Sequence, residues 1–237
     1  MQVKTLFFDI ETTPLISYNW GTYDQTAIEV IEDWYLLCFA YKWQGKGVKA
    51  ERLTNGRKTE KELVQKMHQL LDEADVVIAH NGRKFDVKKV NAKFLEYGLS
   101  VPSPYKIIDT LTEARKHFAL TSNRLDSIGK LLGVGRKVKH PGFEMWKGCM
   151  ADEKKWWDLM IKYNKQDVLL LEAVYEKLLP WIVQPTATWS KQPCPHCGSP
   201  ETQSRGKATT EGGKTRKRHQ CTDCGKWFLG NFIIKRV

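Results

Sequence analysis

The stretch LFFDIETTP, residues 6–14, begins as an apolar strand and ends with two acids. Alternate side chains of a strand share a face, so Asp9 and Glu11 stand side by side. Two neighbouring carboxylates repel each other, and burial adds a desolvation cost. Either the strand ends here and both groups reach water, or they bind a divalent cation, which prefers clustered oxygens.

The composition is that of a basic, well-packed protein. The chain has 237 residues, 41% of them hydrophobic, and a net charge of +11. This length suits one ordinary domain plus a small one. A basic excess favours nucleic acid as partner, although a merely soluble basic protein is the alternative. We see neither a signal-peptide pattern nor an apolar run approaching about 18 residues, so we expect a cytoplasmic protein with no membrane partner.

Hydrophobic periodicity predicts an α/β domain with a mixed sheet flanked by helices. The expected strands are 3–10, 33–43, 48–53, 75–82 and 105–111. The expected helices are 59–71, which Thr59 and Glu62 would open as a capping box, then 85–98, 123–133 and 152–179. Residues 134–150 read as a loop, and the proline-punctuated residues 181–193 read as a linker after a domain of residues 1–180.

Two further acids stand in unexpected places. Asp167 lies on the apolar stripe of the last helix, four residues after Tyr163, and a buried carboxylate needs a partner. That partner is either a lysine or arginine, or a metal. Asp86 opens a helix after the turn at Asn81, where the helix dipole alone would favour an acid. Each acid has an ordinary explanation, but the coincidence of all four favours a common site.

These motifs resemble the DnaQ-like, or DEDD, 3′–5′ exonuclease superfamily on the ribonuclease-H-like fold. FDIET resembles the first exonuclease motif, HNGRKFD the second, and YNKQD, residues 163–167, the third. The tyrosine places the chain in the DEDDy branch, because the sister branch has a histidine where Lys162 stands. The resemblance covers about residues 1–180 and implies a metal-dependent nuclease that works from the 3′ end.

The resemblance implies two Mg²⁺ or Mn²⁺ ions held by Asp9, Glu11, Asp86 and Asp167. Charge supports this independently, since four carboxylates at about −4 call for roughly two divalent cations. Tyr163 is one helical turn from Asp167 and, by resemblance, orients the attacking water. Its ordinary pKa near 10 makes it a poor base at neutral pH.

Other residues near the motifs have two readings each. Asn81 could hydrogen-bond the terminal nucleotide or be a turn residue, and Phe85 could stack on a base or belong to the core. The loop GVGRKVKHPG, residues 133–142, could touch the phosphate backbone or be a solvated basic surface. We expect three further residues to be structural: His80, His140 and Cys149.

The end of the chain carries two C-x-x-C pairs separated by 23 residues. The four thiolates predict a tetrahedral structural Zn²⁺ site, and the segment 194–237 resembles a zinc ribbon. The ligands would be Cys194, Cys197, Cys221 and Cys224. His196 and His219 are rival ligands, and disulfide pairing is the alternative in an oxidising compartment.

Positive charge concentrates in this ribbon segment, which we expect to bind nucleic acid. Residues 191–237 hold ten Lys/Arg and three Asp/Glu. A glycine-containing hairpin over 205–220 would touch phosphates, without sequence specificity, through Lys214, Arg216, Lys217 and Arg218. Trp227 and Phe228 could stack on bases but suit the small core of the ribbon better.

The leading hypothesis is therefore a two-metal 3′–5′ exonuclease. We favour single-stranded DNA as substrate, because FDIET and YNKQD look closest to polymerase-type proofreading domains; such a protein would work with a polymerase or replication partner. An RNA-trimming exoribonuclease is the rival within the same class. A catalytically silent nucleic-acid-binding adaptor is the alternative outside it.

Overall fold

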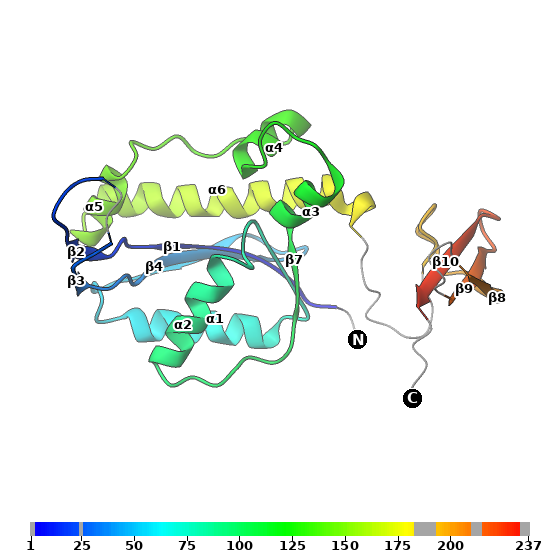
Figure 1. Cartoon of the computed structure of the whole chain (residues 1–237), viewed down its shortest axis with the longest axis horizontal. Coiled ribbons are helices and arrows are strands. Elements are labelled where there is room, and N and C mark those ends of the chain that lie inside the picture. Colours follow the sequence, from blue (N-terminus) through cyan, green and yellow to red (C-terminus); the bar gives the residue numbers. More distant parts are fainter. Residues whose placement is uncertain (1–2, 24–25, 183–192, 210–214, 233–237) are drawn as a thin grey trace. The chain divides into compact units, whose positions relative to one another are not determined.

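The computed structural model describes residues 3–23, 26–182, 193–209 and 215–232. The chain divides into two compact units, Met1–Val183 and Gln184–Val237 (Figure 1), which we treat separately. Among the helices of the described residues, none has the length and apolar character of a membrane span.

Unit 1 contains a five-stranded sheet, a separate two-stranded hairpin and a set of helices. The strands are β1 (Thr5–Thr12), β2 (Ile16–Tyr18), β3 (Glu29–Glu32), β4 (Leu36–Trp43), β5 (Lys49–Arg52), β6 (Val76–Ala79) and β7 (Lys106–Asp109). The helices are α1 (Glu60–Glu73), α2 (Asp86–Glu96), α3 (Thr110–His117), α4 (Leu125–Leu132), α5 (Glu144–Met150), α6 (Lys154–Leu178) and the short 3₁₀ helix η1 (Leu179–Trp181).

The main sheet is mixed, as the sequence predicted. Its strand order is β5-β4-β1-β6-β7, with β1 antiparallel to β4 and parallel to β6. The nearly uninterrupted apolar run of β4 fits its place inside the sheet, where both faces are covered. Helix α6 lies along one face, and α1 and α2 cover the other (Figure 1).

The alternation within β1 decides what each face of the sheet carries. Leu6, Phe8 and Ile10 are buried with the apolar residues of α1 and α2. Phe7 points the other way and packs edge-on against Tyr175 of α6, with 5.6 Å between ring centroids. The face that carries Phe7 therefore also turns the two carboxylates of β1 towards α6.

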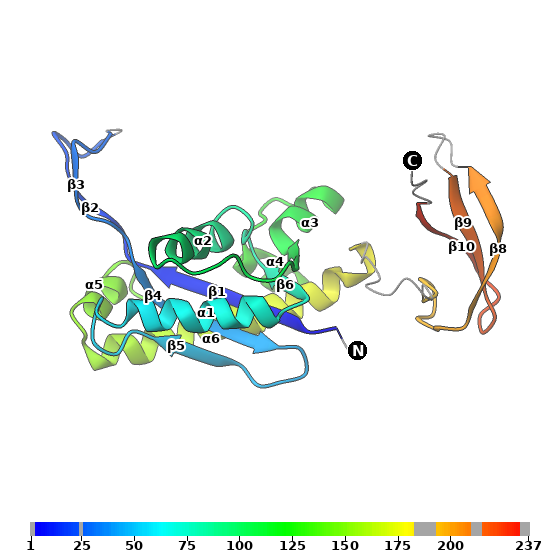
Figure 2. The ribbon, with the colours of Figure 1, turned by 90° about the horizontal axis from the view of Figure 1, so that it is seen from below.

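Three elements differ from the sequence prediction. The hairpin β2–β3 lies between β1 and β4, where we expected no strand, and it extends away from the main sheet (Figure 2). Helix α5 occupies part of the expected loop 134–150. The strand expected at 105–111 stops at Asp109, because that carboxylate accepts hydrogen bonds from Leu111 and Thr112 N–H and so begins α3.

The predicted capping box at Thr59 is wrong. Helix α1 does begin after Thr59, but its hydroxyl makes no capping bond to the helix. The hydroxyl instead accepts hydrogen bonds from the N–H groups of Thr54 and Asn55. The side chain thus stabilises the preceding turn, a competing local use that is common for threonine.

Unit 2 is a three-stranded antiparallel sheet in the order β10-β9-β8. Its strands are β8 (Thr202–Thr209), β9 (Thr215–Cys221) and β10 (Trp227–Phe232). Of the expected linker 181–193, residues 183–192 lie outside the described residues, while Ile182 is buried against unit 1.

Candidate active site and metal centres

The acid cluster begins at the carboxyl end of β1. Asp9 and Glu11 lie opposite Ala40 and Cys38 of β4, and the register shifts directly after Glu11. Such a bulge re-aims the strand at the point where it leaves the sheet. Both carboxylates are therefore held at the centre of the sheet and not at one of its edges.

The second acidic motif is shaped by a tight turn after β6. Asn81 adopts a left-handed conformation with φ of 67°, which asparagine tolerates. A side chain at Gly82 would place its Cβ 2.3 Å from a β-carbon of β6, so the close approach needs glycine. Asp109 accepts hydrogen bonds from the N–H groups of Asn81 (2.9 Å) and Arg83 (3.1 Å), which ties the turn to β7.

This turn delivers Asp86 to the end of β1. Asp86 is 3% exposed, and its carboxylate accepts a hydrogen bond of 3.2 Å from the N–H of Ile10. Ile10 separates Asp9 from Glu11, so the first residue of α2 lies beside the carboxylates of β1. The acid predicted from HNGRKFD therefore joins the acids predicted from FDIET.

Helix α6 supplies the remaining acid from across the sheet face. Asp167 is 1% exposed, and carboxylate oxygens of Asp9, Glu11 and Asp167 lie within 4.8 Å of one another. Tyr163, buried on the same helix one turn earlier, lies next to Asp167. The structure thus brings together the four acids and the tyrosine that the sequence singled out.

Sequence reasoning missed Asn164, which is fully buried. Its amide donates to Oδ2 of Asp9 at 2.7 Å and to the backbone oxygen of Asp9 at 3.3 Å. These bonds fix the orientation of the Asp9 carboxylate from α6. A polar residue three positions before Asp167 on a mostly apolar face was the available signal.

Sequence reasoning also missed Lys137, because residues 133–142 read as a surface loop. Its ammonium lies 2.5 Å from Oδ2 of Asp167 and donates to the Tyr163 hydroxyl at 3.0 Å. The backbone N–H of Lys137 bonds to Asp126, which anchors this stretch at α4. Both readings of Asp167 therefore hold in part, since it pairs with a lysine and also belongs to the carboxylate cluster.

The four acids hold their protons far more tightly than isolated carboxyls. Burial, followed by the charge of Asp86, raises the pKa of Asp9 well above its ordinary value. Burial and then the charge of Asp167 raise the pKa of Glu11 to about 8, and burial raises that of Asp86 to about 7. The pKa of Asp167 also rises through burial, although the ammonium of Lys137 lowers it in part. One lysine does not compensate this cluster.

The donor set fits a divalent cation. Three carboxylates offer clustered hard oxygens, which Mg²⁺ and Mn²⁺ prefer. Oδ1 of Asp167 is buried and has no hydrogen-bond partner among the described residues. Buried polar oxygens are almost always satisfied, so this one is available for a metal. The uncompensated negative charge of the cluster also favours a bound cation.

Aromatic rings border the cluster. The His140 ring lies 4.9 Å from that of Tyr163 and 5.3 Å from that of Trp146, centroid to centroid. The Trp146 side chain also interacts with Glu11 and lowers the pKa of Glu11 in part. Burial and the charge of Asp167 raise the pKa of Tyr163, so its phenol stays protonated at neutral pH. His140 is thus a neighbour of the site and not a remote core residue.

Two residues that the sequence supports less strongly as substrate contacts, Asn81 and Phe85, belong to the turn after β6. Phe85 is 40% exposed, so it is not a core aromatic, and Lys89 lies 5.2 Å from its ring. Asn81 has the backbone conformation of a turn residue. His80 hydrogen-bonds Thr110 and the carbonyl of Asn123, and burial lowers its pKa to about 4, which agrees with a structural role.

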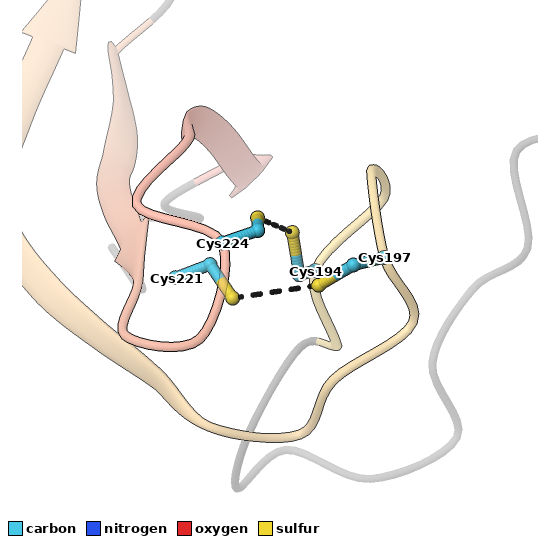
Figure 3. A group of neighbouring side chains, drawn as sticks. All are labelled: Cys194, Cys197, Cys221 and Cys224. Carbon is cyan, nitrogen blue, oxygen red and sulfur yellow. Dashed lines mark hydrogen bonds between the residues drawn. The ribbon is translucent and has the colours of Figure 1, made fainter.

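Unit 2 brings the four cysteines of both C-x-x-C pairs together (Figure 3). Sulfur–sulfur distances are 3.6 Å for Cys194–Cys224 and 3.6 Å for Cys197–Cys221, and all four thiols are free. These distances are too long for disulfides and close to the spacing of about 3.8 Å that tetrahedral Zn–S bonds of about 2.3 Å impose. The four thiols therefore form a candidate zinc centre.

Three basic residues of unit 2 lie on β9, and two others lie on β8. The Arg218 guanidinium lies 4.2 Å from the ring centroid of Trp227, which is 44% exposed and so is not a core residue. Phe228 stacks on His219 at 5.3 Å between ring centroids. Arg216 and Lys217 belong to the same strand, whereas Lys214 lies outside the described residues.

A mixed sheet with carboxylates at its centre and a helix bringing another acid to the same face defines a ribonuclease-H-like domain. A family model described as the RNase_H superfamily matches residues 6–179, so the chain belongs to this superfamily. No curated protein matches the chain. Among solved structures, it is similar to the family B DNA polymerase from the hyperthermophilic archaeon Pyrobaculum calidifontis, with a TM-score of 0.56 and 18% identity. That match covers 76% of this chain but only 25% of the polymerase.

Proposed function

We propose that unit 1 is a metal-dependent 3′–5′ exonuclease of the DnaQ-like DEDDy type, acting most readily on single-stranded DNA. One observation carries this proposal: oxygens of Asp9, Glu11 and Asp167, distant in sequence, meet within 4.8 Å. The membership in the RNase H superfamily supports a nuclease. The polarity and the substrate rest on the motif resemblance.

The residues that would hold the metals are Asp9, Glu11, Asp86 and Asp167. When bound there, two Mg²⁺ or Mn²⁺ ions would supply Lewis-acid stabilisation of the phosphate and an acidified water at neutral pH. Asn164 holds the Asp9 carboxylate in one orientation, as outer-sphere partners of metal ligands do. Such preorganisation spares the site a reorientation when the substrate arrives.

Tyr163 and Lys137 would act on the substrate side. The protonated Tyr163 phenol orients the attacking water by hydrogen bonding and does not remove its proton, because its pKa is raised. Lys137 holds the tyrosine oxygen at 3.0 Å and so fixes the direction of the phenol. The same ammonium offsets part of the negative charge that would otherwise repel a phosphodiester.

Unit 2 would be a structural zinc ribbon that holds the nucleic acid. The Cys194–Cys224 and Cys197–Cys221 contacts support one Zn²⁺. The cations of β9 would contact phosphates without reading the sequence. A polymerase or another replication protein is the partner that this proposal favours.

The test is digestion of single- and double-stranded DNA and RNA, labelled at either end, with Mg²⁺ or Mn²⁺. The proposal predicts mononucleotide release from the 3′ end, fastest on single-stranded DNA and abolished in Asp9→Ala. Asp158→Ala, which removes an exposed acid of the same helix α6, is the matched control and keeps full activity. Faster release from RNA would change the substrate to RNA.

A wild-type protein that binds these strands but releases no nucleotide with either metal would refute the proposal. The chain would then be a binding adaptor. Oligonucleotide binding is measured in the same samples without added metal, so that binding and nucleotide release are observed separately.

A further inference from the structure

Exposed aromatic rings gather on the hairpin between β1 and β4. We call residues 15–23 and 26–34 the aromatic arm; it comprises β2, β3 and the described part of their connection. Its two strands pair only with each other among the described strands, and it projects from the body of unit 1 (Figure 2). Tyr18, Trp20 and Tyr23 are 60%, 89% and 86% exposed. Rings left so open in water indicate a binding surface.

The aromatic arm joins the body of unit 1 beside α2, the helix that begins at Asp86. Thr12 directly follows Glu11, and its hydroxyl accepts a hydrogen bond of 3.1 Å from the ammonium of Lys89. The same ammonium lies 3.8 Å from the ring centroid of Trp34, at the other end of the arm. Lys89 belongs to α2, which begins at the acid Asp86. The chain just before the arm and the last residue of the arm thus both contact the helix that carries Asp86.

The charge of the arm excludes electrostatic attraction to the phosphates of a nucleic acid. No lysine or arginine occurs between residues 5 and 41, although the chain carries a net +11. Glu29, Glu32 and Asp33 make the arm acidic. It therefore offers phosphates no attraction, and what it presents to a ligand is planar apolar surface.

We propose that the aromatic arm stacks on unpaired bases of the nucleic-acid strand whose end lies in the acid cluster. This inference rests on the proposed function, because only residues 12–14 separate Glu11 from the arm, so a strand whose end lies in the acid cluster begins beside the base of the arm. Stacking on aromatic rings accepts any base, since every base has a π-face. The arm supplies base contacts that weaken little with salt, whereas unit 2 supplies phosphate contacts that weaken strongly.

The experiment measures binding in EDTA by fluorescence anisotropy, with the full chain and two oligonucleotides of equal length. One carries bases, and the other is an abasic strand with the same phosphates. Trp20→Ala/Tyr23→Ala should lose at least about fivefold in affinity per ring for the base-containing strand and nothing for the abasic one. The dependence of log Kd on log salt should stay the same.

Two further variants make the result specific. Trp20→Phe/Tyr23→Phe keeps the rings and should retain most of the affinity. Leu95→Ala/Val101→Ala removes two other exposed apolar side chains of unit 1, 83% and 90% exposed, and should bind like the wild type. Because all these side chains are largely in water, their removal should leave the helical circular dichroism unchanged.

An alanine variant that keeps the wild-type preference for bases overturns the inference. Sedimentation velocity tests the alternative that the arm contacts a second copy of the chain. That alternative holds if the wild type is dimeric, the alanine variant is monomeric and the preference for bases is unchanged. This readout requires no turnover. Arm-dependent binding by a protein that releases no nucleotide would therefore refute the proposed function alone.

Discussion

Replacing Glu11 with glutamine should stabilise the metal-free protein at alkaline pH. The folded state raises the pKa of Glu11 from 4.5 to about 8. Below pH 4.5 the carboxyl is protonated in both states and has no effect. Between the two values the folded state binds a proton that the unfolded state has released, so stability falls as the pH rises. Glutamine is neutral at every pH and has nearly the same size and shape as glutamate.

The magnitude follows from the two pKa values. A rise from 4.5 to about 8 corresponds to about 5 kcal/mol once both states have ionised, near pH 9. At about pH 5 only the unfolded state has begun to ionise, and the difference stays below about 1 kcal/mol. Traces of bound cation reduce the stability difference near pH 9, so we expect Glu11→Gln to be more stable than the wild type by at least about 2 kcal/mol in EDTA.

The assay is urea unfolding followed by helical circular dichroism, with EDTA present, at about pH 5 and about pH 9. The signal reports unit 1, because the described residues of unit 2 form strands only. Saturating Mn²⁺ should reduce the stability difference between the variant and the wild type, because the cation binds the native wild type more tightly than the native variant. A Glu11→Gln protein no more stable than the wild type at the higher pH would refute the account of the cluster. The control is Glu172→Gln, which removes the α6 partner of an ion pair with Lys42 of β4 and should destabilise the protein.

Three other changes test separate parts of the molecule. Asn164→Ala should lower nucleotide release by about 10- to 100-fold and weaken Mn²⁺ binding, because Asp9 loses its 2.7 Å hydrogen bond; kinetics and calorimetry measure both, and unchanged Mn²⁺ affinity would contradict the role. Lys137→Met should slow nucleotide release but tighten Mn²⁺ binding at least about threefold, because the lysine ammonium no longer competes with the metal for Asp167. Weaker Mn²⁺ binding would show that Lys137 does not compete with the metal. Cys197→Ser should reduce bound zinc in elemental analysis and flatten the salt dependence of DNA binding without changing the helical signal; a full zinc content would refute the four-thiol site.

The parts of the site that sequence reasoning found are those set by local periodicity. Asp9 and Glu11 share a face because a strand alternates, and Tyr163 and Asp167 share a face because a helix turns every 3.6 residues. The order of strands and helices then limited the sheet to a mixed one. These relations need no knowledge of long-range contacts.

The parts it missed depend on side-chain direction across the fold. Lys137 lies in an irregular segment, and nothing in residues 133–142 indicates that this lysine and not its basic neighbours turns inward. Asn164 reads as an ordinary polar residue until β1 is placed opposite α6. The hairpin β2–β3 was missed because its strands are short and their apolar residues stay exposed, so no burial pattern marks them.

The acid cluster draws its members from β1, α2 and α6, so it depends on contacts that span more than 150 positions, as in the bond between Asn164 and Asp9. During synthesis, a growing chain holds Asp9, Glu11 and Asp86 long before Asp167 leaves the ribosome. The proposed nuclease chemistry therefore cannot begin until nearly all of unit 1 has been translated and α6 has docked.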